Sequence, residues 1–157
     1  MKFSDFVCFE ASIPELQASD RDGVIAELVS SLDQAGKLGQ NKCQEIVAEM
    51  INREKEASTG MGKGVATPHI KNSVVTEVVA AIGQSSAGID FFALDKQPVY
   101  SVILMVSPVD NPDRYLQAME SVFKHLQQEK FRRFLRMCRS SEQIRELLIE
   151  ADEDPSL

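Results

Sequence analysis

The stretch that decides the fold is residues 53–69, REKEASTGMGKGVATPH. It separates two kinds of sequence, because helical spacing dominates before it and β-branched runs follow it. Three glycines occur in the five positions from Gly60 to Gly64, and their backbone entropy disfavours a regular helix or strand there. We therefore expect residues 57–64 to form a turn that joins a helical part of the chain to a sheet.

The sequence before this stretch has the spacing of helices. From Asp20 onward, apolar residues recur at the interval of one helix face, and Gly36 supplies a C-terminal stop signal. A second helix is expected to begin after Asn41, whose side chain would cap it in a capping box with Gln44. This helix should end near Glu56.

The sequence after it changes to strands and then returns to helices. Val74–Ile82 and Val99–Val106 are β-branched runs bounded by turn residues, and Ile89–Leu94 is a shorter strand candidate. In the last third of the chain, Asn111 can cap a helix that has Pro112 at its first position.

Apolar residues support this helix and predict two more. A single apolar stripe runs from Tyr115 to Leu126, as in a helix with one buried face. A short helix is expected around Phe131, and Ser140 with Gln143 should cap the last one.

This order of elements predicts the fold class. Helices, then strands, then helices around one sheet indicate an α/β fold with helices packed on both faces. We expect a single domain over residues 1–157, in which residues 1–15 and 150–157 are peripheral or loose.

The composition argues against several classes of function. A formal net charge of −7 disfavours a nucleic-acid-binding surface and an anionic-membrane anchor, and no run approaches the roughly 18 apolar residues of a membrane span. Three well-separated cysteines indicate reduced thiols of a cytoplasmic protein, and two histidines leave no metal site. The basic run from Lys130 to Arg139 is interpreted as a solvated helix face balanced by nearby acids.

His69 is the residue with the clearest chemical role. Pro68 fixes its own φ and restricts Thr67 to extended backbone, so the imidazole of His69 is presented from a stiff segment. A neutral imidazole nitrogen is a nucleophile that can attack phosphorus without a metal. Taken alone, however, a histidine after a proline is usually a half-exposed turn residue.

Neighbouring residues favour the phosphoryl interpretation as an ordered set. The guanidinium of Arg53 pairs well with phosphate. The turn lacks the G-x-x-x-x-G-K-[ST] spacing, so a nucleotide site is not indicated. Further candidate donors to a phosphoryl group are the hydroxyls of Ser58 and Thr59 and the backbone N–H groups around Gly60, Gly62 and Gly64.

The set R-E-x-x-x-S-T-G-M-G-K-G-V-A-T-P-H resembles the signature of the mannitol/fructose-type enzyme IIA family of the bacterial phosphotransferase system. The resemblance extends from about Leu16 to Leu148 and implies a mixed β-sheet with helices on both sides. It implies that His69 accepts a phosphoryl group from the histidine-phosphocarrier protein, with support from Arg53. It implies no cofactor, because the phosphoryl donor is a protein.

One position departs from the family pattern. Tyr115 stands where the family has a second histidine, and a tyrosine can donate a hydrogen bond but cannot carry the positive charge of an imidazolium. His125 is not a substitute, because it falls outside the apolar stripe and is expected to face solvent. The resemblance therefore leaves the efficiency of phosphoryl transfer open.

Three functions remain open. We expect a free-standing protein, and the S-T-G-x-G-x-G wording is closer to the nitrogen-regulatory branch, in which a phosphohistidine relay signals to a downstream regulatory protein. The alternative is a fructose- or mannitol-type IIA that donates to a separate IIB component. A third possibility is a binding-only regulatory module that has lost phosphoryl transfer.

Overall fold

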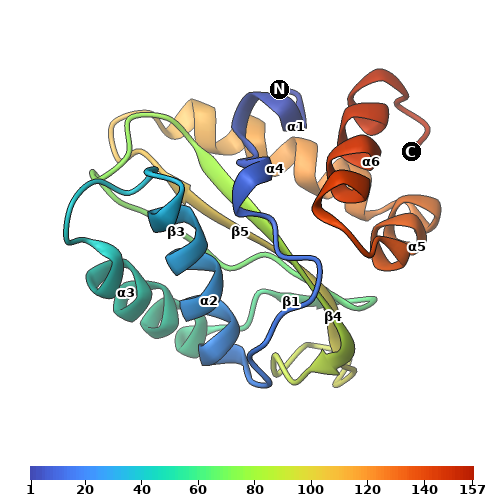
Figure 1. The fold of residues 1–157 in the computed structure, drawn as a ribbon, viewed down its shortest axis with the longest axis horizontal. Coiled ribbons are helices and arrows are strands. Elements are labelled where there is room, and N and C mark those ends of the chain that lie inside the picture. Colours follow the sequence, from blue (N-terminus) through green and yellow to red (C-terminus); the bar gives the residue numbers. More distant parts are fainter.

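The computed structural model describes residues 1–157 and places six α-helices around one five-stranded sheet (Figure 1). The helices are α1 (Phe3–Phe6), α2 (Arg21–Gln34), α3 (Cys43–Glu56), α4 (Pro112–Leu126), α5 (Glu129–Met137) and α6 (Ser141–Glu153), with a 3₁₀ turn at Phe9–Ala11. The strands are β1 (Gly60–Gly62), β2 (Val65–Ala66), β3 (His69–Lys71), β4 (Val79–Ile89) and β5 (Val99–Ser107). No helix is both long and apolar enough to cross a membrane.

Strand β5 is the centre of the sheet. It pairs in parallel with β2 and β3 and antiparallel with β4, while β1 pairs antiparallel with β2. The sheet is therefore mixed, as the resemblance implied. Successive side chains of a strand point to opposite faces, so Leu104 belongs to one hydrophobic cluster and its neighbours Ile103 and Met105 belong to the other.

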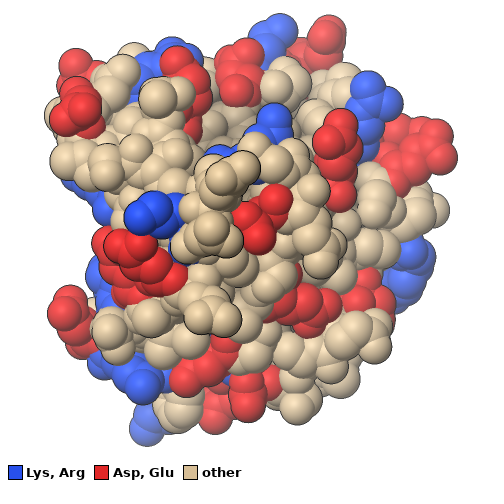
Figure 2. Space-filling model, turned by 60° about the vertical axis from the view of Figure 1, so that its left-hand side comes forward, with Lys and Arg blue, Asp and Glu red and all other residues tan.

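Helices cover both faces of the sheet, which confirms the predicted layering (Figure 1). The first cluster packs the apolar faces of α2 and α3 against the sheet. The second packs α1, α4, α5 and α6 against the opposite face. The face of the molecule shown in Figure 2 mixes Lys and Arg with Asp and Glu side chains, so neither sign forms a continuous field there.

Three of the helices begin at side-chain caps. Ser140 accepts a hydrogen bond from the N–H of Gln143 at 3.1 Å, and Asn111 accepts one from the N–H of Arg114 at 3.3 Å, both as predicted. The third cap is Asp20, which accepts from the N–H of Gly23 at 2.7 Å.

The capping box expected at the start of α3 is absent. Asn41 has a φ of 59° and lies outside the helix, whose N-cap is Lys42 without a side-chain cap. Asn tolerates this left-handed backbone better than most residues, so Asn41 serves the turn before the helix.

The strand predictions need three corrections. The run Val74–Ile82 becomes a strand only from Val79, where β4 begins. Residues 90–94 do not form a strand, because β4 runs on to Ile89 and Phe92 then adopts a φ of 53°. The glycine run was expected to hold no strand, yet Gly60–Gly62 pairs with β2 as a short, irregular antiparallel strand. Glycine allows this because Gly62 has a φ of +96°, which most side chains disfavour.

The two ends of the chain are not loose, contrary to expectation. Phe3 and Leu157 are both almost completely buried. The carboxylate of Asp152 accepts hydrogen bonds from the N–H groups of Phe3 at 2.6 Å and Ser4 at 3.0 Å, so α6 holds α1 in place. Residues 7 and 13 continue this attachment by bridging to β4.

His125 is also buried, and the expectation that it faces solvent is wrong. Its ring contacts Phe3 and Phe131, with centroids at 5.0 and 5.4 Å, and its Nδ1–H donates to the main-chain oxygen of Leu157. The apolar stripe in the sequence did not reveal that His125 is buried, because its partners Phe3 and Leu157 come from the two ends of the chain. His125 therefore has a structural role.

The three cysteines are free, with Cys8 and Cys138 buried and Cys43 half-buried. Burial raises the pKa of the Cys138 thiol, despite the opposing charge of Arg139. This protonated, buried thiol has the character of a packing residue.

Candidate functional site

His69 is held at the start of β3 by pairing with β5. Its register partner is Met105, whose N–H donates to the carbonyl of Pro68 at 2.9 Å. His69 itself remains half-buried. The stiff segment predicted from Pro68 is thus anchored on the central strand, and the imidazole side chain reaches the surface.

The hydrogen bonds of His69 select one tautomer. Nδ1 lies 2.8 Å from the carbonyl oxygen of Thr67, and a carbonyl oxygen can only accept, so Nδ1 carries the proton. Nε2 therefore keeps its lone pair and accepts a hydrogen bond from the hydroxyl of Tyr115 at 3.1 Å. The nitrogen farther from the backbone is the nucleophilic one.

A hollow of about 490 Å³ opens beside this nitrogen. It is bordered by α3, β3 and α4, which contribute Arg53, His69 and Tyr115 respectively. The structure therefore brings together these three residues, which were singled out in the sequence at separations of up to 62 positions. Its other lining residues are Glu49, Asn52, Glu56, Ile70 and Lys71.

Two cations accompany the histidine. One N–H group of the Arg53 guanidinium donates to the carbonyl of Ala57 at 3.0 Å, which leaves other N–H groups available in the hollow. Lys71 places its Nζ 4.8 Å from the centre of the Tyr115 ring, within the range of a cation–π contact. Neither cation forms an ion pair.

The hydroxyls of Ser58 and Thr59 do not line the hollow, contrary to the sequence-based expectation. Ser58 donates to the carbonyl of Phe91 at 2.6 Å and accepts from the N–H of Gly60 at 3.0 Å. Thr59 donates to the carboxylate of Glu54 through its hydroxyl at 2.8 Å and its N–H at 2.7 Å. The hydrogen bonds of these side chains stabilise the turn, and the buried Glu54 links the first residues of the turn to α3.

The glycine run also lies away from His69. A Cβ atom at Gly60 would approach the Cβ of Ala93 to 2.8 Å, so glycine here permits close packing of two backbones. Gly60 and Gly62 border no part of the His69 hollow, and Gly64 lines a different one. The expected cradle of backbone N–H groups around the histidine is not formed.

Sequence reasoning missed several polar residues of the hollow. Lys71 is two positions after His69 on one strand, so both side chains share a face. Glu49, Asn52 and Glu56 share a face of α3 with Arg53 through their helical spacing. The spacing of two on the strand and the helical spacing on α3 would have identified these residues once the strand and the helix were assigned.

The chain matches a known protein family over most of its length. The family model for the "Phosphoenolpyruvate-dependent sugar phosphotransferase system, EIIA 2" matches residues 10–151. A fructose-specific EIIABC component from Bacillus subtilis is 30% identical over 152 residues, which are 97% of this chain and 24% of that protein. This chain thus spans about a quarter of the length of that relative.

Two further proteins are similar over most of their length. A nitrogen regulatory protein from Klebsiella oxytoca is 34% identical over 128 residues, or 80% of this chain and 76% of the relative. The crystal structure of nitrogen regulatory protein IIA-Ntr from Neisseria meningitidis superposes with a TM-score of 0.83 at 21% identity, covering 93% of this chain and 98% of that one. This likeness shows a common fold.

Proposed function

The chain belongs to the EIIA 2 family of the phosphoenolpyruvate-dependent sugar phosphotransferase system, and on this premise we propose that His69 accepts a phosphoryl group and passes it on or signals its presence. The observation that carries the proposal is the fixed tautomer, with Nδ1–H on the Thr67 carbonyl and the Nε2 lone pair accepting from the hydroxyl of Tyr115, which lines the hollow together with His69. The proposed donor is the histidine-phosphocarrier protein, phosphorylated on its own histidine.

The transfer requires one bond to form and one to break. The Nε2 lone pair of His69 attacks phosphorus in line while the P–N bond to the carrier's imidazole breaks. The Tyr115 hydroxyl gives up its hydrogen bond to Nε2 as the lone pair attacks. The carrier's imidazole leaves with the electron pair of the broken bond and keeps the N–H on its other ring nitrogen, so no net proton is taken up. The Nδ1–H of His69 stays on the Thr67 carbonyl throughout, so the ring keeps its orientation.

The residues of the hollow are placed to stabilise the charge on the transferred group. The free N–H groups of Arg53 can donate to phosphoryl oxygens, and guanidinium suits this geometry. The hydroxyl of Tyr115 donates to Nε2 in the free protein, and it can donate to a phosphoryl oxygen once Nε2 is bonded to phosphorus. Lys71 adds a positive charge beside the tyrosine.

The proposal is tested by incubating the protein with radiolabelled phosphoenolpyruvate, enzyme I and the carrier protein. We expect label that is labile in acid and stable in alkali, as for a phosphoramidate, and that maps to the peptide containing His69. Omitting the carrier protein should remove it. Folded protein that takes up no label would overturn the proposal and would favour the binding-only module.

Two downstream roles follow from the relatives. We favour a regulatory relay, in which the phosphorylated and free forms bind a regulatory protein differently, because a nitrogen regulatory protein is 34% identical over 80% of this chain. The second candidate is a sugar-specific donor to a IIB component, which is supported by the fructose-specific relative. Adding an isolated fructose-type IIB domain to the labelled protein distinguishes them, since only a donor passes the label on.

Tyr115 provides a further test of how the phosphoryl group is stabilised. Replacing it by histidine (Tyr115→His) restores an imidazolium that can make a charge-assisted hydrogen bond, which is roughly twice as strong as a neutral one. We expect the phosphoryl lifetime or the transfer rate to rise about tenfold, equivalent to about 1.4 kcal/mol. Quench-flow transfer and hydrolysis of the isolated phosphoprotein measure the two quantities.

Tyr115→Phe is the matched control for this substitution, because it keeps the ring and the Lys71 contact but removes the hydroxyl. It should move the same quantities in the opposite direction. Identical behaviour of all three proteins would exclude residue 115 from the site.

A further inference from the structure

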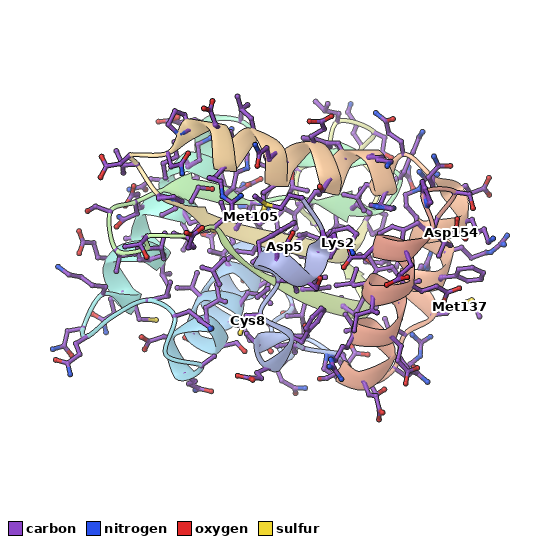
Figure 3. All side chains as sticks on the ribbon, turned by 90° about the horizontal axis from the view of Figure 1, so that it is seen from above. Lys2, Asp5, Cys8, Met105, Met137 and Asp154 are labelled. Carbon is purple, nitrogen blue, oxygen red and sulfur yellow. The ribbon has the colours of Figure 1, made fainter.

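A second hollow, of about 630 Å³, lies at the other end of β5 beneath α5. Tyr100 and Ser101 of β5 line it, whereas His69 pairs with Met105, four residues further along the strand, or roughly 13 Å. In Figure 3, Met105 lies well inside the molecule, whereas Met137, which lines the second hollow, lies at its edge. The two hollows share no lining residue.

This second hollow, called the arginine hollow below, is strongly cationic. Five Lys or Arg side chains line it against two carboxylates, Asp95 and Glu129, which leaves a formal excess of three positive charges. None of the five forms an ion pair within 4.0 Å, because the ion pairs of the protein lie elsewhere. The five cations are Lys63, Arg132, Arg133, Arg136 and Arg139.

No ion pair within 4.0 Å balances the basic run, so acids act on it only at longer range, as Glu15 does on Arg139 and Asp154 on Lys130. One of the two carboxylates is already committed, since Asp95 accepts from the N–H groups of Lys63 at 3.1 Å and Gln97 at 3.0 Å. The unpaired cations are concentrated in one place on a protein whose net charge is −7. An anionic ligand would relieve their mutual repulsion.

The guanidinium groups are held in place without being neutralised. Arg136 lies 3.5 Å above the centre of the Tyr100 ring, a close cation–π contact. Arg139 donates to the carbonyls of Arg136 at 2.9 Å and Cys138 at 3.2 Å, and Arg132 donates to the carbonyl of Leu126 at 2.6 Å. Each guanidinium has five N–H donors, so most remain free for a ligand.

The surroundings of Tyr100 limit what that ligand can be. Arg136 covers a face of the ring, and Gly64 and Gly88 lie so close that an added Cβ would approach ring atoms to 3.2 and 3.0 Å. The ring therefore positions Arg136 and is not free to stack on a base. Gly64 also brings the glycine run, predicted from the sequence to suit an anion, to this hollow and not to His69.

We propose that the arginine hollow binds a small anion that carries two or more phosphate groups. Guanidinium groups match phosphate oxygens in pairs, and the volume lies within the range of small-ligand sites. A ligand with one phosphate would engage only part of the cationic set, so charge selects for two or more. The site is separate from phosphoryl acceptance at His69, because the two hollows share no lining residue.

The proposal is tested by isothermal titration calorimetry of the unphosphorylated wild type at low ionic strength, with no phosphoenolpyruvate present. Inorganic pyrophosphate and triphosphate should bind with one saturable site, at least tenfold more tightly than orthophosphate or citrate. Arg133→Gln/Arg136→Gln should weaken pyrophosphate binding at least tenfold, whereas Lys42→Gln/Lys55→Gln, with the same loss of charge outside the hollow, should not.

Three results would overturn it. Citrate binding as tightly as pyrophosphate would show a general anion surface, and equal weakening in both double variants would show a nonspecific field. Binding of polyglutamate but not of pyrophosphate would indicate an acidic protein segment instead. Because no phosphoryl transfer takes place in this assay, its outcome is independent of the role proposed for His69.

Discussion

Replacing His69 by glutamine is expected to abolish phosphoryl uptake, with labelling reduced at least about a thousandfold. Glutamine can place an amide near the position of the ring but has no nucleophilic nitrogen lone pair, so no P–N bond can form. His69 lies half-buried on a short strand, and its main-chain pairing with β5 does not depend on the ring. The variant should therefore keep its fold, with a free energy of unfolding within about 1 kcal/mol of the wild type. The labelling assay measures phosphoryl uptake, and circular dichroism checks that the variant is folded.

His125 supplies the matched control, because it is the other histidine of the chain. His125→Gln should accept label as the wild type does below its melting temperature. It should also lose about 1–3 kcal/mol of stability, since the ring is buried between Phe3 and Phe131 and bonds to Leu157. Replacing His69 should therefore abolish labelling and leave the stability nearly unchanged, whereas replacing His125 should leave labelling unchanged and lower the stability. A labelled His69→Gln protein would contradict the assignment of the acceptor.

Phe3→Ala is expected to cost about 3–5 kcal/mol of unfolding free energy, although the residue is the third of the chain. The Phe3 ring is completely buried, stacks on Phe131 with centroids 5.8 Å apart and contacts His125. Removing it leaves a cavity between α1, α4 and α5. For a domain of this length, the melting temperature should fall by about 6–20 °C. Differential scanning calorimetry measures this change.

Ser4→Ala is the control for this prediction. The Ser4 side chain is exposed, and its contact with Asp152 is made by the main-chain N–H, which alanine retains. Its effect should stay within about 0.5 kcal/mol. If Phe3→Ala were equally mild, the first residues of the chain would be peripheral after all.

Features that depend on neighbours in sequence were predictable. Asn111 and Ser140 each cap a helix by accepting from the N–H of the residue three positions later in the chain. A four-residue pattern therefore contains both the acceptor and the donor. The β-branched run of β5 and the segment leading from Pro68 into His69 are equally local. The phosphoryl-acceptor hypothesis followed from that short segment.

Features that depend on distant partners were not predictable from single positions. The hydroxyls of Ser58 and Thr59 have the right chemistry to bind a phosphate. In the folded chain, however, they donate hydrogen bonds to Phe91 and Glu54 instead. The burial of His125 requires residues from both ends of the chain. Local patterns indicate which groups can bond, and only tertiary packing decides which groups they meet.

The hydrogen bond from His69 Nδ1 to the Thr67 carbonyl has a consequence for the energetics of a relay. Under the proposed function, a phosphoryl group moves from one imidazole to another, so the bond made and the bond broken are of the same kind. The proton on Nδ1 need not move in either direction. Such an exchange is close to thermoneutral and reversible. The fraction of phosphorylated protein then follows the phosphorylated fraction of its partner, so the chain reports the phosphorylation state of that partner.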